Sequence, residues 1–148
     1  MNRVTRDTGS KYPIIQAPMG WIARSQLASA VCKAGGMGII ETSSGEIDNC
    51  KREIKLMSKL TDKPFGVNLP LLFLNDDSMV NFCVEAGVKF VTTSAGDPTK
   101  YINVLKNADI TVIPWNVPYS HIDSKIGKWN FGKVSVLSGC NVGDLVIT

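Results

Sequence analysis

The stretch 13-PIIQAPMG-20 is the first unit of a pattern that decides the fold class. It is a short apolar run that stops in a Pro/Gly turn, and the apolar residues Leu27, Ala30, Val31 and Ala34 then recur at helical spacing. A buried strand that ends in a tight loop of small residues is where α/β proteins place flat ligands. We therefore predict a strand over residues 13–16, followed by a candidate binding loop and a helix.

The same alternation of strand and helix continues along the chain. Further strands are predicted at residues 37–40, 65–68, 89–93 and 110–113. Helical spacing predicts helices after the capping-box pattern Ser43-Ser44-Gly45-Glu46, from near Asp76, and after Asp97-Pro98, where an N-cap precedes a proline. Five strands spaced by roughly 25 residues, each but the last followed by an amphipathic helix, indicate an α/β protein with a parallel sheet.

Two architectures fit this alternation. With 148 residues the chain has the length of an open doubly wound sheet, whereas a (β/α)8 barrel of roughly 250 residues would be only about half present. Length alone favours the open sheet. However, the glycine-rich nucleotide loops of open sheets, G-x-G-x-x-G and G-x-x-x-x-G-K-[ST], do not occur in the sequence.

Composition narrows the class of protein. The 16 basic and 13 acidic residues are scattered, without a basic stripe, so we expect no nucleic-acid partner. No stretch reaches the roughly 18 apolar residues of a membrane span, and we expect no membrane contact. Cys32, Cys50, Cys83 and Cys140 are widely separated and form no C-x-x-C, which is typical of free thiols in a reducing compartment. The expected location is the cytoplasm.

Three loops at the carboxyl ends of predicted strands carry the candidate site, because these ends share one face of a parallel sheet. The first is Ala17-Pro18-Met19-Gly20, where the backbone can approach a flat ring; otherwise it is a strand-ending turn. The second ends in Asn68, whose amide offers a donor and an acceptor, or closes a local Asx turn. The third, residues 92–96, clusters hydroxyl groups with small residues, or simply leads to the Asp97 cap.

Other catalytic chemistries find little support in the sequence. His121 is the only histidine, and it lies in an irregular segment where it is either a solvated side chain or a base, provided that the segment folds over the site. The spacing of cysteine and histidine indicates no metal site. A serine hydrolase is not indicated, because G-x-S-x-G is missing.

Four segments together resemble one family. Residues 12–20 (YPIIQAPMG), 34–38 (AGGMG), 61–69 (TDKPFGVNL) and 90–98 (FVTTSAGDP) are similar, in order and spacing, to the nitronate monooxygenase family, formerly called 2-nitropropane dioxygenases. Members are FMN enzymes on a TIM (β/α)8 barrel. The resemblance implies that residues 1–114 form the N-terminal half of an FMN-binding barrel, with about five βα units. Residues 115–148 would be a divergent, irregular tail of unknown role.

The resemblance also implies roles for residues. Ala17, Pro18 and Met19 would lie against the flavin ring, Asn68 would hydrogen-bond it, and Ser94 and Gly96 would flank the substrate. The implied reaction oxidises an alkyl nitronate with dioxygen to a carbonyl compound and nitrite. The catalytic residue stays unassigned, because His121 lies beyond the matching segments. The family's glycine-rich loops for the FMN phosphate have no counterpart either, so we expect the chain alone to bind FMN weakly or not at all.

Two other functions fit the same residues. One is a truncated, non-catalytic half barrel or interaction module, whose open sheet edges would invite self-association. The other is a flavin-dependent enoyl reductase on a related barrel, which the same N-terminal loops would serve.

Overall fold

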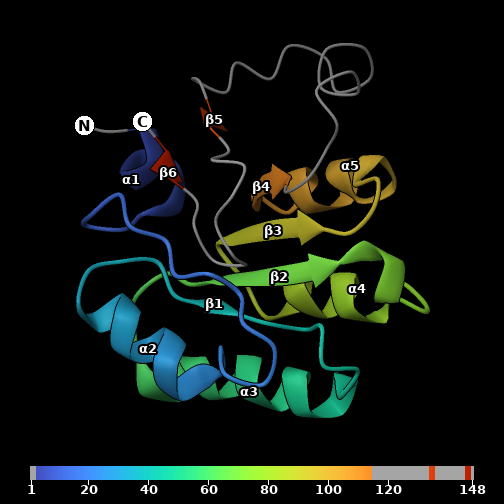
Figure 1. Cartoon of the computed structure of the whole chain (residues 1–148), viewed down its shortest axis with the longest axis horizontal. Coiled ribbons are helices and arrows are strands. Elements are labelled where there is room, and N and C mark those ends of the chain that lie inside the picture. Colours follow the sequence, from blue (N-terminus) through green and yellow to red (C-terminus); the bar gives the residue numbers. More distant parts are fainter. Residues whose placement is uncertain (1–2, 115–133, 136–145, 148) are drawn as a thin grey trace.

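The computed structural model describes residues 3–114, 134–135 and 146–147. The elements are α1 (Arg3–Thr8), α2 (Ser25–Lys33), β1 (Ile39–Ile40), α3 (Ile47–Leu60), β2 (Gly66–Pro70), the 3-10 helix η1 (Leu71–Phe73), α4 (Ser78–Glu85), β3 (Phe90–Ser94), α5 (Thr99–Asn107), β4 (Thr111–Pro114), β5 (Val134–Ser135) and β6 (Val146–Ile147). Figure 1 shows β1 to β4 side by side, with α2 to α5 packed against them. β5 and β6 pair antiparallel with each other.

The sheet of β1 to β4 is parallel, and its strands lie in the order in which they occur in the chain, β1-β2-β3-β4. A doubly wound sheet reverses its strand order at a switch point, whereas a barrel adds each new strand to the same edge. The described strands follow the barrel order. The expectation from chain length was therefore wrong, and the partial barrel implied by the family resemblance is confirmed.

The two faces of the sheet are packed differently. Val67, Leu69, Val91 and Val112 point to one face and share a core with the apolar sides of α2, α3, α4 and α5. On the other face, Phe90 packs with Met37 and Ile39 in a second, smaller cluster. Because side chains alternate along a strand, Asn68, Thr92 and Ser94 share the face of Phe90, not that of the helices. This second face is the inner face of the partial barrel.

The expected strand at residues 13–16 is reduced to a single bridge. Ile15 pairs with Met37, supported by hydrogen bonds from Met37 N to Ile14 O and from Gln16 N to Met37 O, of 2.8 and 2.9 Å. The Gln16 side chain then makes the next pair of hydrogen bonds in place of the backbone. Its Nε2 donates to Ile39 O at 3.2 Å, and its Oε1 accepts from Ile39 N at 3.3 Å. The side-chain amide thus replaces a peptide group, and the backbone is released from the sheet.

Three helix starts also differ from expectation. α3 begins at Ile47 without a capping box, because the Glu46 carboxylate pairs with Arg24 at 3.0 Å. α5 begins at Thr99, one residue later than expected, although Asp97 Oδ1 does accept the Thr99 N–H at 2.9 Å. The sequence did not predict α1. Thr111 Oγ1 at the start of β4 donates to the carbonyl of Asp7 in α1 at 3.0 Å, and this bond connects the two elements.

One contact on the inner face leaves no room for a larger side chain. Gly66 lies opposite Phe90 in the β2–β3 register, and a Cβ at position 66 would meet Phe90 Cε1 at 2.2 Å. The Phe90 ring is itself fully buried, so it has little freedom to move away. The Phe90 ring therefore occupies the space of a side chain at position 66. It packs the inner face at the amino-terminal end of β2 and β3, before the polar residues of the site.

Gly66→Ala is expected to lower the free energy of unfolding by about 1 to 3 kcal/mol, because the new methyl group overpacks the buried ring. Urea unfolding followed by circular dichroism measures the change. Gly20→Ala is the control, since its Cβ would meet Ser43 Oγ at an ordinary 3.5 Å, and we expect a change within about 0.5 kcal/mol. Equal effects of the two substitutions would contradict the overpacking.

Candidate active site

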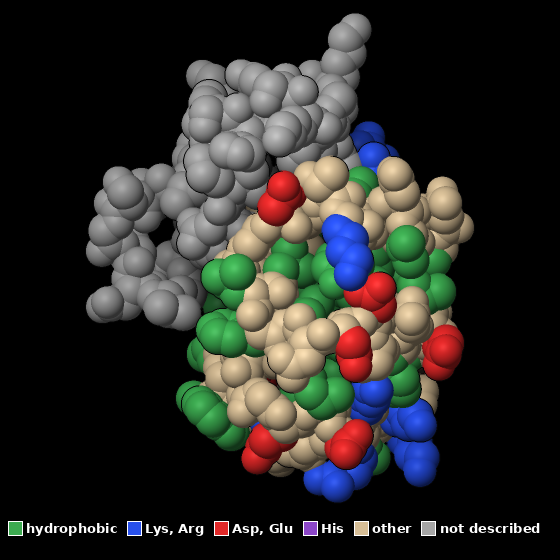
Figure 2. All heavy atoms as spheres, turned by 90° about the vertical axis from the view of Figure 1, so that its right-hand side faces the viewer, with side chains coloured by type: hydrophobic (Ala, Val, Ile, Leu, Met, Phe, Trp, Pro, Cys, Tyr) green, Lys and Arg blue, Asp and Glu red, His purple; other side chains and the backbone are tan. Residues whose placement is uncertain are grey.

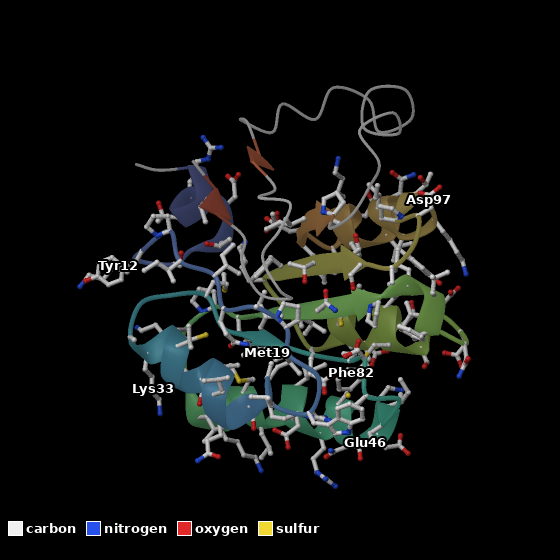
Figure 3. The ribbon with its side chains drawn as sticks, in the orientation of Figure 1. Tyr12, Met19, Lys33, Glu46, Phe82 and Asp97 are labelled. Atoms are coloured by element: carbon white, nitrogen blue, oxygen red, sulfur yellow. The ribbon has the colours of Figure 1, made fainter. Side chains whose placement is uncertain are left out.

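The loops that follow the strands converge at one end of the molecule. In Figure 1, β2 and β3 point toward the same side, and Figure 2 looks onto that side, where hydrophobic side chains lie between acidic and basic ones. Figure 3 shows Glu46 and Asp97 at this end and Met19 nearer the middle of the sheet. Two of the three candidate loops lie partly within strands, since residues 66–68 belong to β2 and residues 92–94 to β3.

A ladder of polar side chains crosses β2 and β3 on the inner face. Asn68 is paired in register with Thr92, whose Oγ1 donates to Asn68 Oδ1 at 2.9 Å. Asn68 Nδ2 donates to Ser94 Oγ at 3.3 Å, and the Asn68 carbonyl accepts from Thr42 Oγ1 at 2.7 Å. Asn68 is only 4% exposed. The structure thus brings Asn68 and Ser94 together, and the amide contacts the neighbouring strand instead of closing an Asx turn.

This ladder has hydrogen-bonding capacity beyond its internal bonds. A carboxamide carries two N–H groups and an oxygen that accepts twice, so the bonds to Thr92 and Ser94 use about half of what Asn68 offers. Because Asn68 sits on a strand and its amide bonds to two residues of β3, its remaining donor and acceptor have a fixed direction. Such a pair suits the edge of a planar heterocycle that alternates N–H and C=O groups.

The loop after Gln16 runs beside β1. Ala17, Pro18, Met19 and Gly20 are all half-buried. The Met19 carbonyl accepts from Ile22 N and Ala23 N, at 3.1 and 2.8 Å, so the chain turns sharply there before α2. The Glu41 N–H donates to Ala23 O at 3.0 Å and joins the end of this turn to the end of β1. The turn that contains Met19 thus ends beside the last residues of β1.

The turn after β3 packs against the loop after β2. Ala95 has a φ of 49° and Gly96 a φ of 151°, and a Cβ at Gly96 would lie 2.8 Å from Leu71 Cβ. The Ala95 carbonyl accepts from Leu72 N at 2.8 Å. Gly96 is therefore needed for close approach to η1. Of the two residues expected on the substrate side, Ser94 joins the polar ladder, and Gly96 shapes the loop behind it.

Sequence reasoning missed Glu41, which follows β1 directly and is fully buried. Its Oε1 accepts from Trp21 N at 3.2 Å and pairs with Arg24 at 2.9 Å, and its Oε2 accepts from Ser43 N at 2.7 Å. A carboxylate at the end of an apolar strand run is the only local signal for such a role. Its partner Trp21 lies 20 residues away, so no short motif contains the pair.

Four large apolar side chains are exposed in two of these loops. Trp21 and Ile22 are 68% and 63% exposed, and Leu72 and Phe73 are 77% and 62% exposed. The first pair lies in the loop before α2, and the second lies in η1, after β2. Contiguous exposed apolar patches are typical of surfaces that receive a ligand or a partner.

The described cysteines lie in helices and not in the candidate loops. Cys32, Cys50 and Cys83 are free and buried, and burial raises the pKa of each thiol, that of Cys83 to about 12. Within the described ranges, no group of three acidic, cysteine or histidine residues comes together to hold a metal ion. No helix in that part of the chain is long and apolar enough to cross a membrane. His121 and Cys140 lie outside the described residues.

Comparisons with known proteins point to one family. Residues 2–139 match the family described as nitronate monooxygenase. A carboxyl-CoA dehydrogenase of Mycobacterium tuberculosis, named for a hydroxy-methyl-oxo-octahydroindene substrate, is 30% identical over 92% of this chain. A nitronate monooxygenase of Pseudomonas aeruginosa is 44% identical over 46% of the chain. This chain spans 38% of the first relative and 19% of the second.

Solved structures agree with the partial barrel. FabK from Thermotoga maritima superposes with a TM-score of 0.73 at 41% identity, and the match covers 77% of this chain and 37% of FabK. A nitroalkane oxidase from Streptomyces ansochromogenes superposes with a TM-score of 0.65 at 26% identity, covering 76% of this chain and 42% of that one. The similarity therefore extends over most of the described residues.

The buried thiols give a test of the core. Cys32, Cys50 and Cys83 are expected to resist a maleimide reagent at neutral pH, because they are buried and their raised pKa values leave little thiolate. Mass spectrometry of peptides after brief labelling shows which residues react, and all three should react in denaturant. Rapid modification of Cys50 in the native protein would contradict the packing of α3 against the sheet.

Proposed function

Because the chain belongs to the nitronate monooxygenase family, we propose that it acts in an FMN-dependent oxidoreductase that converts an alkyl nitronate and dioxygen into a carbonyl compound and nitrite. The observation that carries the proposal is the hydrogen-bonded ladder of Asn68, Thr92 and Ser94 on the inner face of β2 and β3. The family match supports a flavin, and the ladder supplies groups that a flavin ring needs. We further propose that the flavin is FMN and that the substrate is an alkyl nitronate.

The residues present fit one edge of a flavin ring. Asn68 offers one N–H and one acceptor position beyond its bonds to Thr92 and Ser94, and the ring edge carries complementary C=O and N–H groups. Ala17, Pro18 and Met19 would lie against the ring, because small residues let the backbone approach. Barrels usually hold a cofactor phosphate with loops after strands seven and eight, so these residues account for the ring alone.

When bound, the flavin would supply the electron-accepting chemistry, and the protein's part is to bind, orient and shield. The Asn68 amide would fix the orientation of the ring, since Thr92, Ser94 and Thr42 hold its side chain and backbone. Ser94 would also present a hydroxyl toward the substrate. The half-buried segment of Ala17 to Gly20 would keep water away from one side of the ring.

A second enzymatic function is favoured by the apolar loops. Trp21, Ile22, Leu72 and Phe73 expose large hydrophobic surfaces beside the site, more than a small nitronate would use. The relative from Mycobacterium tuberculosis is named for a carboxyl-CoA substrate with fused rings. The alternative is therefore a flavin-dependent enoyl reductase or related enzyme, with a bulky acyl thioester packed on these side chains.

A non-catalytic role is the third candidate. Among the described strands, β4 pairs only with β3, and the other side of the sheet ends in the single Ile15–Met37 bridge. Both edges present backbone groups to which another strand would bind, so a second copy of the chain or a complementary barrel half is the expected partner. In that case the chain would contribute the ring-binding face only after association.

One experiment separates these functions. The purified chain is incubated with FMN and desalted, and the flavin absorbance that stays with the protein is recorded. Retained flavin and oxygen uptake with an alkyl nitronate would support the proposal and contradict the expected weak binding of FMN by the chain alone. Retained flavin and oxidation of NADH or NADPH with an enoyl thioester would support the alternative. A colourless protein that elutes as a multimer would support the interaction module and contradict independent catalysis.

Asn68→Ala is expected to weaken FMN binding about tenfold, because one or two hydrogen bonds to the ring are lost. Titration of FMN fluorescence measures the affinity. Asn81→Ala, at an exposed position of α4, is the matched control and should bind as the wild type does. Equal affinities for Asn68→Ala and the wild type would show that the ladder does not contact the flavin.

A further inference from the structure

Glu41 is a fully buried carboxylate that the proposed chemistry does not use. It lies at the end of β1 and receives donors from two different loops. The Trp21 N–H donates to Oε1 at 3.2 Å, from the loop before α2. The N–H groups of Ser43 and Ser44 donate to Oε2 at 2.7 and 3.2 Å, from the loop before α3. One side chain thus joins two loops at the edge of the inner face.

In the loop before α2, Ala23 is buried and its carbonyl accepts the Glu41 N–H at 3.0 Å, but the two residues before it are exposed. Trp21 and Ile22 are 68% and 63% exposed, so apolar packing contributes little there. Trp21 also has a φ of 59°, a conformation that a bulky residue adopts at a cost of roughly 1 to 3 kcal/mol. Such a conformation persists only where neighbouring contacts enforce it. The hydrogen bond from this same residue to Glu41 is a contact of that kind.

The charge of Glu41 is balanced within the same cluster. Arg24 pairs with Glu41 Oε1 at 2.9 Å, and its side chain is 13% exposed. The Ser43 hydroxyl donates a further hydrogen bond to Oε2, of 2.9 Å. A buried ion pair adds little stability compared with apolar residues of the same volume. What the carboxylate supplies here is a fixed position for the groups around it.

We propose that Glu41 is a positioning residue that holds the loop before α2 in the orientation in which Ala17, Pro18 and Met19 face a flavin. The Met19 carbonyl accepts the N–H groups of Ile22 and Ala23, so fixing Trp21 also fixes Met19 within the same turn. Glu41 itself does not contact the ring. That the ligand is a flavin rests on the proposed function, whereas the hold on the loop does not.

Glu41→Gln tests the hold without any ligand. Hydrogen–deuterium exchange of the full chain should show the amides of residues 19–24 exchanging about tenfold faster, while those of α5 keep the wild-type rate. Glu46→Gln is the matched control: Glu46 also pairs with Arg24, at 3.0 Å, but its side chain is 50% exposed and donors from Trp21 do not reach it. Unchanged exchange in residues 19–24 of Glu41→Gln would overturn the proposal.

Faster exchange throughout the chain, α5 included, would also overturn it, since Glu41 would then serve general stability. If Glu41→Gln does not fold, Ser43→Ala replaces it, because it removes only the 2.9 Å bond to Oε2. This variant should raise exchange in residues 19–24 by a smaller factor, and exchange equal to the wild type would overturn the proposal.

Adding FMN separates the two proposals. If the wild type binds FMN, Glu41→Gln should raise the Kd about tenfold and reduce the shift of the flavin absorbance bands, with Glu46→Gln unchanged. An unchanged Kd and spectrum in Glu41→Gln would overturn the positioning role. A wild type that binds no FMN would contradict the proposed function, and the exchange data would still decide whether Glu41 holds the loop.

Discussion

The parallel pairing of β2 with β3 in a single register determines both the packing of the inner face and the geometry of the candidate site. It places Gly66 under the Phe90 ring, Asn68 beside Thr92 and Pro70 beside Ser94. A slip of one residue would turn Asn68 toward the helices and Leu69 toward the inner face. The steric fit of Phe90 on Gly66 favours this register, so a hydrophobic contact at one end of the strands helps to align the polar groups at the other.

The loops at the carboxyl ends carry backbone strain that the rest of the fold compensates. Among the described residues, Trp21, Ala95 and Asp109 are the non-glycine residues with positive φ. Asp109 ends the turn after α5, but Trp21 and Ala95 lie in loops of the site. Each of these two has a backbone group held by a neighbouring loop, through Glu41 in one case and Leu72 N–H in the other. Hydrogen bonds between loops thus hold these two residues where apolar packing is limited.

Much of the fold follows from local patterns, and the missed features depend on distant contacts. Apolar periodicity predicted α2 to α5 and β1 to β4 within a few residues, and the family resemblance correctly favoured the barrel over the open sheet. Asn68 and Ser94 were identified because each lies at or just after the end of a predicted strand, although both belong to the observed strands. Glu41 was missed because its partners Trp21 and Arg24 are far away in sequence. The strand at residues 13–16 was overestimated because composition does not show that a glutamine side chain will take a backbone position.

The Gln16 side chain makes the conformation of the first loop independent of the strand pairing in the sheet. Because the Gln16 amide completes the ladder at Ile39, the chain leaves the sheet at residue 17 with the pairing of β1 already satisfied. The length and sequence of the next few residues are therefore not constrained by strand pairing. The conformation of this loop can therefore change without a change in the strand pairing of the sheet beside it.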